Sequence, residues 1–191
     1  GDDIAFGHGS SAAFNELVRI KGNGNVGIGL TNPLSKLHVM NTTSGTTPNP
    51  FAQTIIENND LTFLNILSTQ ESGILFGSGG QATNGAIVYS PAAMPNTLQF
   101  RTNNNLTRMT ISDAGNVAIG GFKADFPLQF TGITGDKISL WGGPGNHYGF
   151  GIQTALLQIH SAASTDDIAF GYGTSASFTE RMRIKGTGEV G

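Results

Sequence analysis

The chain has 191 residues, no cysteine and a formal net charge of −3, and its ten basic residues are dispersed along the sequence. Without a basic patch it has nothing to neutralise a run of phosphates, and without cysteine it forms neither disulfides nor thiolate metal sites, so nucleic acid is excluded as an expected partner. No apolar run approaches the roughly 20 residues of a membrane helix, so we expect no membrane insertion.

The first element of the chain is a module that returns twice. Residues 2–27 recur without a gap as residues 166–191, at an offset of 164 and with 18 of 26 positions identical. Residues 108–120 form a weaker third copy that matches residues 17–29 at an offset of 91. Because a repeat unit rarely buries its apolar face alone, the periodicity indicates part of a longer repeating protein.

Each copy predicts a strand, a glycine turn and a short second strand. In residues 181–185 charged side chains alternate with apolar ones, the period of two that is typical of a strand. The side chains expected to share a core are Val18, Ile20, Met109, Ile111, Met182 and Ile184. The glycines expected to need positive φ in the turns are Gly24, Gly115 and Gly188. No segment keeps a helical period, so we expect an all-β chain of short strands and Gly hairpin turns in repeated units.

The repeats divide the sequence into three expected units. Residues 1–33 are the end of one repeat unit and hold the first strand-turn-strand module. Residues 34–121 form a second unit, in which the polar stretch 41–50, with two prolines, is the best candidate for a linker. Residues 122–191 form the third unit, whose end repeats residues 2–27.

Short strands rich in glycine bury little within one chain. A module offers a handful of inward apolar side chains, each stabilising by about 1.5 to 3 kcal/mol when buried, against an ordering cost of about 1 to 2 kcal/mol per residue. A lone copy is therefore not expected to fold. We expect burial against neighbouring units or chains, which an intertwined homotrimer achieves by pointing three apolar faces at a common axis.

One segment predicts a recognition site. Trp141, His147 and Tyr148 flank a loop rich in glycine, and if Ile138 and Leu140 point inward, alternation places Trp141 outward, where its ring could stack on the face of a sugar. These three residues are the candidate contacts to a cell-surface glycan. The alternative is that Trp141 and Tyr148 pack against an adjacent unit or chain.

Two other patterns suggest chemistry that the sequence does not support. The glycine spacing from Gly22 to Gly27 matches a dinucleotide-binding motif, but residues 28–33 are not the helix that such a site requires. The acids Asp2, Asp3 and Glu16 could suggest a glycosidase pair, yet they recur in the copy at 166–180, which favours a scaffold role. We therefore expect no catalytic residues, no cofactor and no enzyme activity.

The histidines give no metal motif. The chain has four, His8, His38, His147 and His160. No two of them form a His-x-His or His-x-x-x-His pair, the spacings of short metal-binding motifs. His8 is also replaced by Tyr172 in the matching copy. The sequence predicts no metal site.

Residues 180–191 joined to residues 26–39 resemble the RMRI…GNVGIG…P…KLHV repeat of phage tail-fibre-like and bacterial surface-fibre proteins, and residues 136–158 are similar to a recurring unit of such proteins. The resemblance implies an elongated homotrimeric β-fibre, extracellular on a virion or a bacterial surface, that supports adhesion or host recognition. The expected function is a structural shaft segment. The alternatives are a carbohydrate-binding module on the fibre and a polysaccharide depolymerase.

Overall fold

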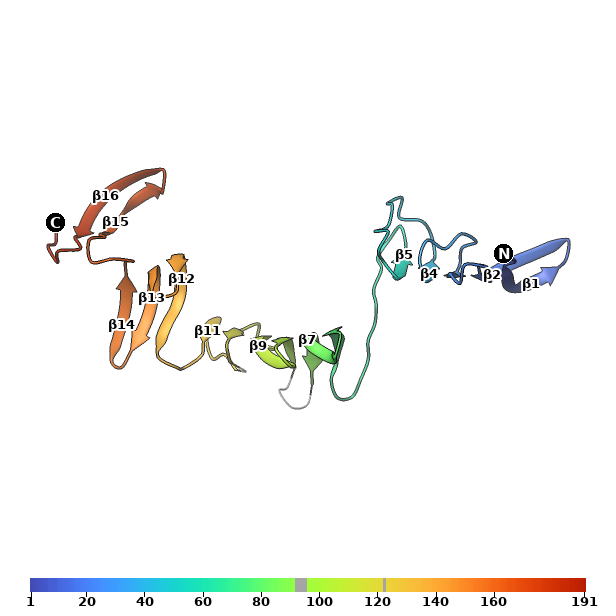
Figure 1. Ribbon diagram of the computed structural model, residues 1–191, viewed down its shortest axis with the longest axis horizontal. Helices are drawn as coiled ribbons and strands as arrows, with labels where there is room; N and C mark the ends of the chain where they lie inside the picture. The colour runs from blue at the N-terminus through green and yellow to red at the C-terminus, as the bar shows by residue number, and fades with distance from the viewer. Residues whose placement is uncertain (92–95, 122) are drawn as a thin grey trace. The chain divides into compact units, whose positions relative to one another are not determined.

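The computed structural model describes residues 1–91, 96–121 and 123–191, and these residues form strands and no helix (Figure 1). The expectation of an all-β chain is confirmed. Within the described ranges, no helix has the length and apolar character that crossing a membrane demands. Phe122, the first residue of the predicted third unit, lies outside the described residues.

The chain divides into two compact units, Gly1–Ile66 and Leu67–Gly191. The first unit holds one five-stranded sheet in which the strands follow chain order. Its strands are β1 (Ile4–Ser10), β2 (Ala13–Ile20), β3 (Val26–Ile28), β4 (Leu37–Met40) and β5 (Thr54–Glu57). The pairs β1–β2 and β2–β3 are antiparallel, whereas β3–β4 and β4–β5 are parallel.

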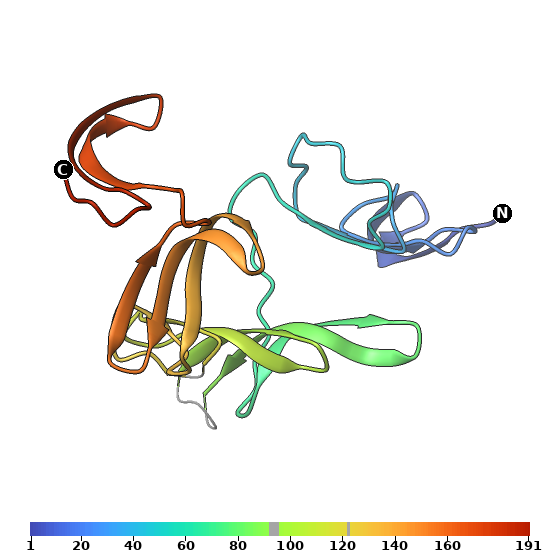
Figure 2. The same ribbon diagram turned by 60° about the vertical axis from the view of Figure 1, so that its left-hand side comes forward.

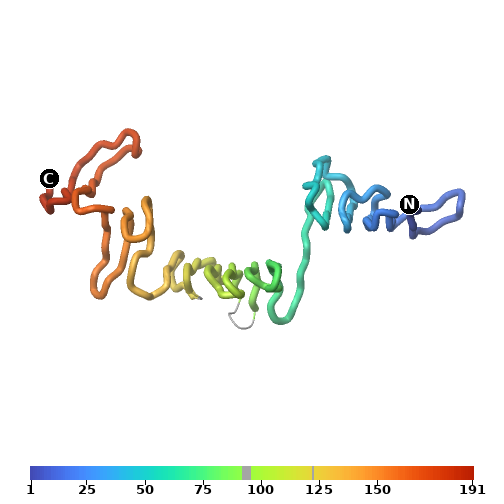
Figure 3. The backbone as a smooth tube through the Cα atoms, in the orientation of Figure 1, coloured from blue at the N-terminus to red at the C-terminus, as the bar shows by residue number. Residues whose placement is uncertain are grey.

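The second unit holds three sheets, whose strands Figure 2 shows in green to red; Figure 3 traces the same backbone as a tube. The six-stranded sheet contains β6 (Ser72–Ser78), β7 (Gln81–Ser90), β8 (Thr97–Thr102), β9 (Leu106–Ile111), β10 (Val117–Ile119) and β11 (Leu128–Phe130). The three-stranded sheet contains β12 (Gly135–Gly143), β13 (Asn146–Gln153) and β14 (Leu156–His160). The two-stranded sheet contains β15 (Ile168–Thr174) and β16 (Ser177–Ile184).

The three sequence copies have the same turn. In the first, the amide of Lys21 donates to the carbonyl of Asn25 at 2.8 Å, and the amide of Gly24 donates to the carbonyl of Lys21 at 2.7 Å. The same two bonds recur at 112–116 and at 185–189. Gly24, Gly115 and Gly188 have φ values of 83°, 80° and 91°. Glycine is favoured there because it adopts this left-handed conformation without a steric penalty.

Hydrogen-bonded sheets continue across the positions at which repeats divide the sequence. Strand β3 pairs in parallel with β4 across position 33, and β10 pairs in parallel with β11 across position 121. The polar segment 41–50 lies between β4 and β5, which pair directly with each other. That segment is therefore a crossover within one sheet.

Each sheet has one apolar face that the chain itself leaves uncovered. In the first sheet, cross-strand register aligns half-buried or exposed apolar side chains, namely Ile4, Phe6, Val18, Ile20, Val26, Ile28, Leu37, Val39 and Ile56. In the six-stranded sheet the aligned set is Ile87, Tyr89, Leu98, Phe100, Met109, Ile111, Val117, Ile119, Leu128 and Phe130. Phe170 and Met182 are paired in the same way, as are Ile168 and Ile184.

The buried side chains of the six-stranded sheet lie on its other face and are mostly small or polar. They are Ala86, Val88, Ser90, Thr97, Gln99, Thr110 and Ala118. None of the six residues predicted to share a core is fully buried within the chain, and Met182 remains 40% exposed. The chain thus packs its small and polar residues inward and leaves its large apolar residues accessible.

Candidate functional site

The sheet β12–β13–β14 separates two kinds of side chain onto its two faces. Register places one set of apolar and aromatic residues on a single face, here called the aromatic face: Ile138, Trp141, Tyr148, Phe150, Ile152, Leu157 and Ile159. The other face carries Asp136, His147, Gly149, Gly151, Gln158 and His160. The alternation of β13, with a period of two, produces this division.

Two irregularities in β12 decide which side chains reach each face. The pairing skips Lys137 and Leu140, since its register shifts between Asp136 and Ile138 and again between Ser139 and Trp141. An extra residue in one strand reverses the side to which the following side chains point. The strict alternation assumed from the sequence therefore fails here, and Trp141 shares a face with Ile138.

Trp141 and Tyr148 form a direct cross-strand pair on the aromatic face. Their ring centroids lie 5.7 Å apart at an interplanar angle of 56°. Trp141 is 69% exposed, whereas Tyr148 is half-buried and its hydroxyl donates to Asp166 Oδ2 at 2.7 Å. That hydrogen bond raises the pKa of Tyr148. His147 is buried on the opposite face, so the structure unites two of the three glycan candidates and separates the third.

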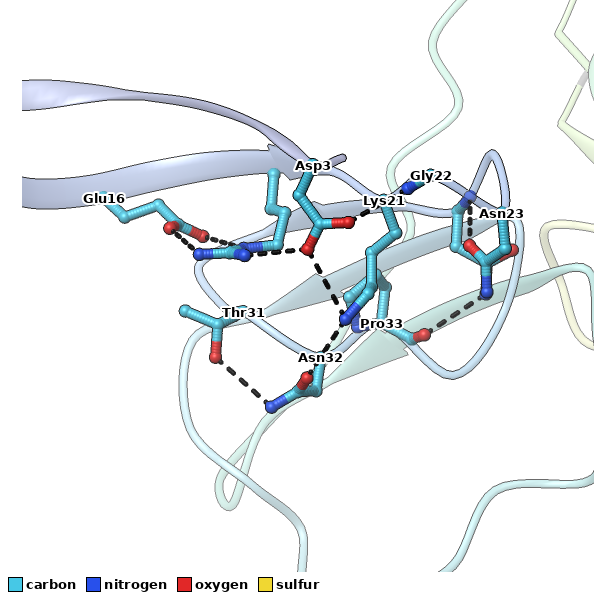
Figure 4. Close-up of polar contacts among 10 residues, drawn as sticks. Asp3, Glu16, Lys21, Gly22, Asn23, Thr31, Asn32 and Pro33 are labelled. Atoms are coloured by element: carbon cyan, nitrogen blue, oxygen red, sulfur yellow. Dashed lines mark hydrogen bonds and ion pairs between the residues drawn. The ribbon is translucent and has the colours of Figure 1, made fainter. Parts of the chain in front are cut away.

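Asp3 and Glu16 of the N-terminal module are held by one arginine (Figure 4). The Arg19 guanidinium donates to Asp3 at 2.9 Å and to both carboxylate oxygens of Glu16. The amide of Gly22 donates to Asp3 at 3.0 Å. The pKa of Asp3 is lowered, mainly by the hydrogen bond from the Gly22 amide and next by the one from Arg19. The hydrogen bond from Arg19 lowers the pKa of Glu16.

The C-terminal module repeats this arrangement. Arg183 donates to Asp167 and Glu180, and the Gly186 amide donates to Asp167 at 3.0 Å. The Arg183 hydrogen bond is the largest cause of the lowered pKa at both carboxyls. A general acid needs a carboxyl held protonated, and these contacts favour the ionised form instead.

His38 and His8 each have a hydrogen-bond partner for the ring atom Nε2. His38 Nε2 lies 3.0 Å from Glu57, and His8 Nε2 lies 2.9 Å from the Asn15 amide nitrogen. Glu57 also accepts a hydrogen bond from the Ser44 amide at 2.6 Å. The Ser44 amide is the largest cause of the lowering of the Glu57 pKa to about 2. These groups hold the crossover 41–50 against β5.

The other two histidines converge on Asp136. His147 Nε2 and His160 Nε2 each lie 3.7 Å from a carboxylate oxygen of Asp136, and the three ligand atoms all lie within 4.8 Å of one another, close enough to hold a metal ion. The sequence prediction of no metal site missed this group because its members stand 11 and 13 residues apart. Only the pairing of three strands brings them together.

Comparison with protein-family models found no match to this chain, and no curated protein matches it.

Proposed function

We propose that this chain is a structural shaft segment of a homotrimeric extracellular fibre, of a phage tail or a bacterial surface appendage, that supports adhesion or host recognition. Its role is mechanical: the repeated modules set length, and packing among three copies supplies stiffness. The partner is a second and a third copy of the same chain.

The uncovered apolar faces are the observation that carries the proposal. The chain exposes 13467 Å² at a mass of 19.9 kDa. Two separate compact domains sharing that mass as one third and two thirds would expose about 10,000 Å². Phe6 is 54% exposed and Phe170 is 45% exposed at equivalent positions. Copies of the same chain supply matching apolar faces, and burying them contributes about 25 cal/mol per Å².

The connection between β5 and β6 supports the same conclusion. Residues 58–71 join no sheet, and Figure 1 draws no strand arrow between β5 and β6. Their apolar side chains are exposed, with Leu61 at 76%, Phe63 at 81% and Leu67 at 82%. An exposed apolar connector is expected where other chains cover it.

The recurring acids favour a scaffold over a hydrolase. Arg19 and Arg183 bind equivalent carboxylates in the two copies. Pairing of the ionised carboxylates with arginine explains why these acids recur, and no catalytic role is needed. The same contacts brace β1 against β2 and β15 against β16 where each hairpin opens.

A carbohydrate-binding module is the second candidate, and the exposure of Trp141 favours it. An accessible indole beside the loop 143–145 could stack on a sugar ring. However, Trp141 lies on the aromatic face, among the residues that the trimer would bury. Interchain packing therefore accounts for Trp141 together with its neighbours, whereas sugar stacking accounts for Trp141 alone.

A charge placed on one face of β1 tests the proposal. Phe6 and Ala5 are adjacent, both exposed, and on opposite faces of the strand. We expect Phe6→Asp to raise the protein concentration below which the trimer dissociates by at least about tenfold, since an unpaired charge is costly to bury in an apolar interface. Ala5→Asp is the matched control and should sediment like the parent. Equal sedimentation of all three proteins as monomers would refute the trimer.

A further inference from the structure

We propose that Asp136, His147 and His160 form a binding site for one divalent transition-metal ion per chain, of the Zn²⁺ type, that ties β12, β13 and β14 together. The ligands are a carboxylate oxygen of Asp136 and the Nε2 atoms of both histidines. Each ligand comes from a different strand of the sheet. This site lies on the face opposite Trp141 and is independent of the fibre proposal.

Unsatisfied nitrogen atoms at the centre of the group carry the argument. His147 is 8% exposed and His160 is half-buried. Within the part of the chain that the structure describes, neither buried Nε2 atom has a hydrogen-bond partner. A buried polar atom without a partner is costly. A cation bound to both lone pairs removes that cost.

The contacts of the His160 ring leave its Nε2 free to bind a metal. His160 Nδ1 lies 3.1 Å from the backbone carbonyl oxygen of His147. A carbonyl only accepts, so Nδ1 carries the proton and donates, and in the neutral ring the lone pair is on Nε2. Metal-bound histidines are oriented in this way by a hydrogen bond from the other ring nitrogen.

Two glycines make room for the group. A Cβ at Gly149 would lie 2.0 Å from the Ile138 carbonyl oxygen and 3.3 Å from His147 Cδ2. A Cβ at Gly151 would lie 2.9 Å from Gln158 Oε1 and 3.3 Å from Asp136 Oδ1. Without these side chains, the His147 ring and the Asp136 carboxylate extend over β13 toward each other. The skipped residue Lys137 places Asp136 on this face.

The distances suit a single ion. With metal–nitrogen and metal–oxygen bonds of about 2.0 to 2.2 Å, tetrahedral ligand atoms are about 3.3 to 3.6 Å apart. His147 Nε2 lies 3.7 Å from Asp136 Oδ2 and His160 Nε2 lies 3.7 Å from Asp136 Oδ1, and one ligand atom from each residue lies within 4.8 Å of the others. Imidazole with carboxylate favours Zn²⁺, Fe²⁺, Ni²⁺ or Cu²⁺ over Ca²⁺ or Mg²⁺. Three protein ligands leave one position open toward a pocket of about 230 Å³ lined by Gln153 and Gln158.

Calorimetric titration of the full chain with Zn²⁺ tests the site. The expected result is one ion per chain, with binding weakened at least about tenfold in Asp136→Asn and in His160→Gln. Asp136 is the first variant because its side chain is 59% exposed, so the substitution leaves the packing intact. His8→Gln is the matched control and should bind as the parent does.

A second readout separates direct ligation from an effect on folding. Titration with Co²⁺ should shift the ring resonances of His147 and His160 in NMR spectra and leave those of His8 unchanged. Absence of binding by the parent, binding by both ligand variants as tight as that of the parent, or one ion per three chains would each overturn the proposal.

Discussion

Trp141 stands directly opposite Tyr148 across the β12–β13 hairpin, with the ring centroids 5.7 Å apart. The Tyr148 hydroxyl donates to Asp166, so the pair connects this sheet to the start of the repeated C-terminal module. A polar contact therefore anchors Tyr148, while the neighbouring Trp141 indole stays exposed.

Trp141→Ala should lower the stability of the assembled protein by about 3 kcal/mol per chain, because a packed indole is replaced by a cavity. The measurement is the thermal midpoint of the oligomer. Leu156→Ala is the control, since Leu156 is also exposed but lies on the opposite face. An unchanged midpoint together with lost retention on a glycan column would favour the carbohydrate-binding alternative.

Stability should fall in acid because of the arginine-bound carboxyls. The pKa values of Asp3, Glu16, Asp167 and Glu180 are lowered in the folded chain. The unfolded chain then binds more protons at low pH, so this stabilisation is complete above the ordinary carboxyl values of about 4 and is lost as the pH falls through the folded values.

The combined variant Arg19→Gln and Arg183→Gln tests this origin. It should melt at a lower temperature at neutral pH, and its midpoint should change less than that of the parent between about pH 6 and pH 3. Parallel pH profiles for the two proteins would show that these arginines are not the source of the acid sensitivity.

Glu57→Gln should release the crossover 41–50. The Glu57 carboxylate accepts hydrogen bonds from the Ser44 amide and from the Thr43 and Ser44 hydroxyls, and its pKa is lowered to about 2. We expect faster hydrogen exchange at the Ser44 amide and faster proteolysis within 41–50. The same change should appear in the parent only as the pH falls well below 4.5, the ordinary value for this carboxyl. Unaltered exchange in the variant would contradict this tether.

Gly115→Ala should destabilise the chain through backbone conformation alone. No atom lies within 4 Å of a Cβ built at this position, and φ is 80°. The expected cost is about 1 to 2 kcal/mol, measured by denaturant unfolding. Gly79→Ala is the control, because its Cβ also meets open space and its φ is not in the left-handed region. Equal stability of the two variants would contradict the requirement for positive φ.

The local features of the fold were predictable because they are encoded in adjacent residues. The alternation in residues 181–185 and the glycine at 188 predict a strand followed by a turn, and both are found in all three copies. Parallel pairing was not predictable: nothing near Val26 in the sequence identifies Leu37 as its partner in β4. Such pairing depends on contacts between strands separated by a crossover.

The site was only partly predictable for the same kind of reason. Composition singles out Trp141 and Tyr148, but the bulges at Lys137 and Leu140 reverse the faces of β12. Nothing in the sequence marks those bulges, since the strand reads as continuous. His147 and His160 meet because β13 and β14 pair in one register, which an examination of short spacings does not detect.

The molar mass of the purified chain, measured by light scattering coupled to size-exclusion chromatography, decides whether three copies assemble. We expect three times the 19.9 kDa chain mass, because the apolar faces of β1–β5, β6–β11 and β12–β14 need other copies to cover them. A stable, soluble particle with the mass of a single chain would contradict it.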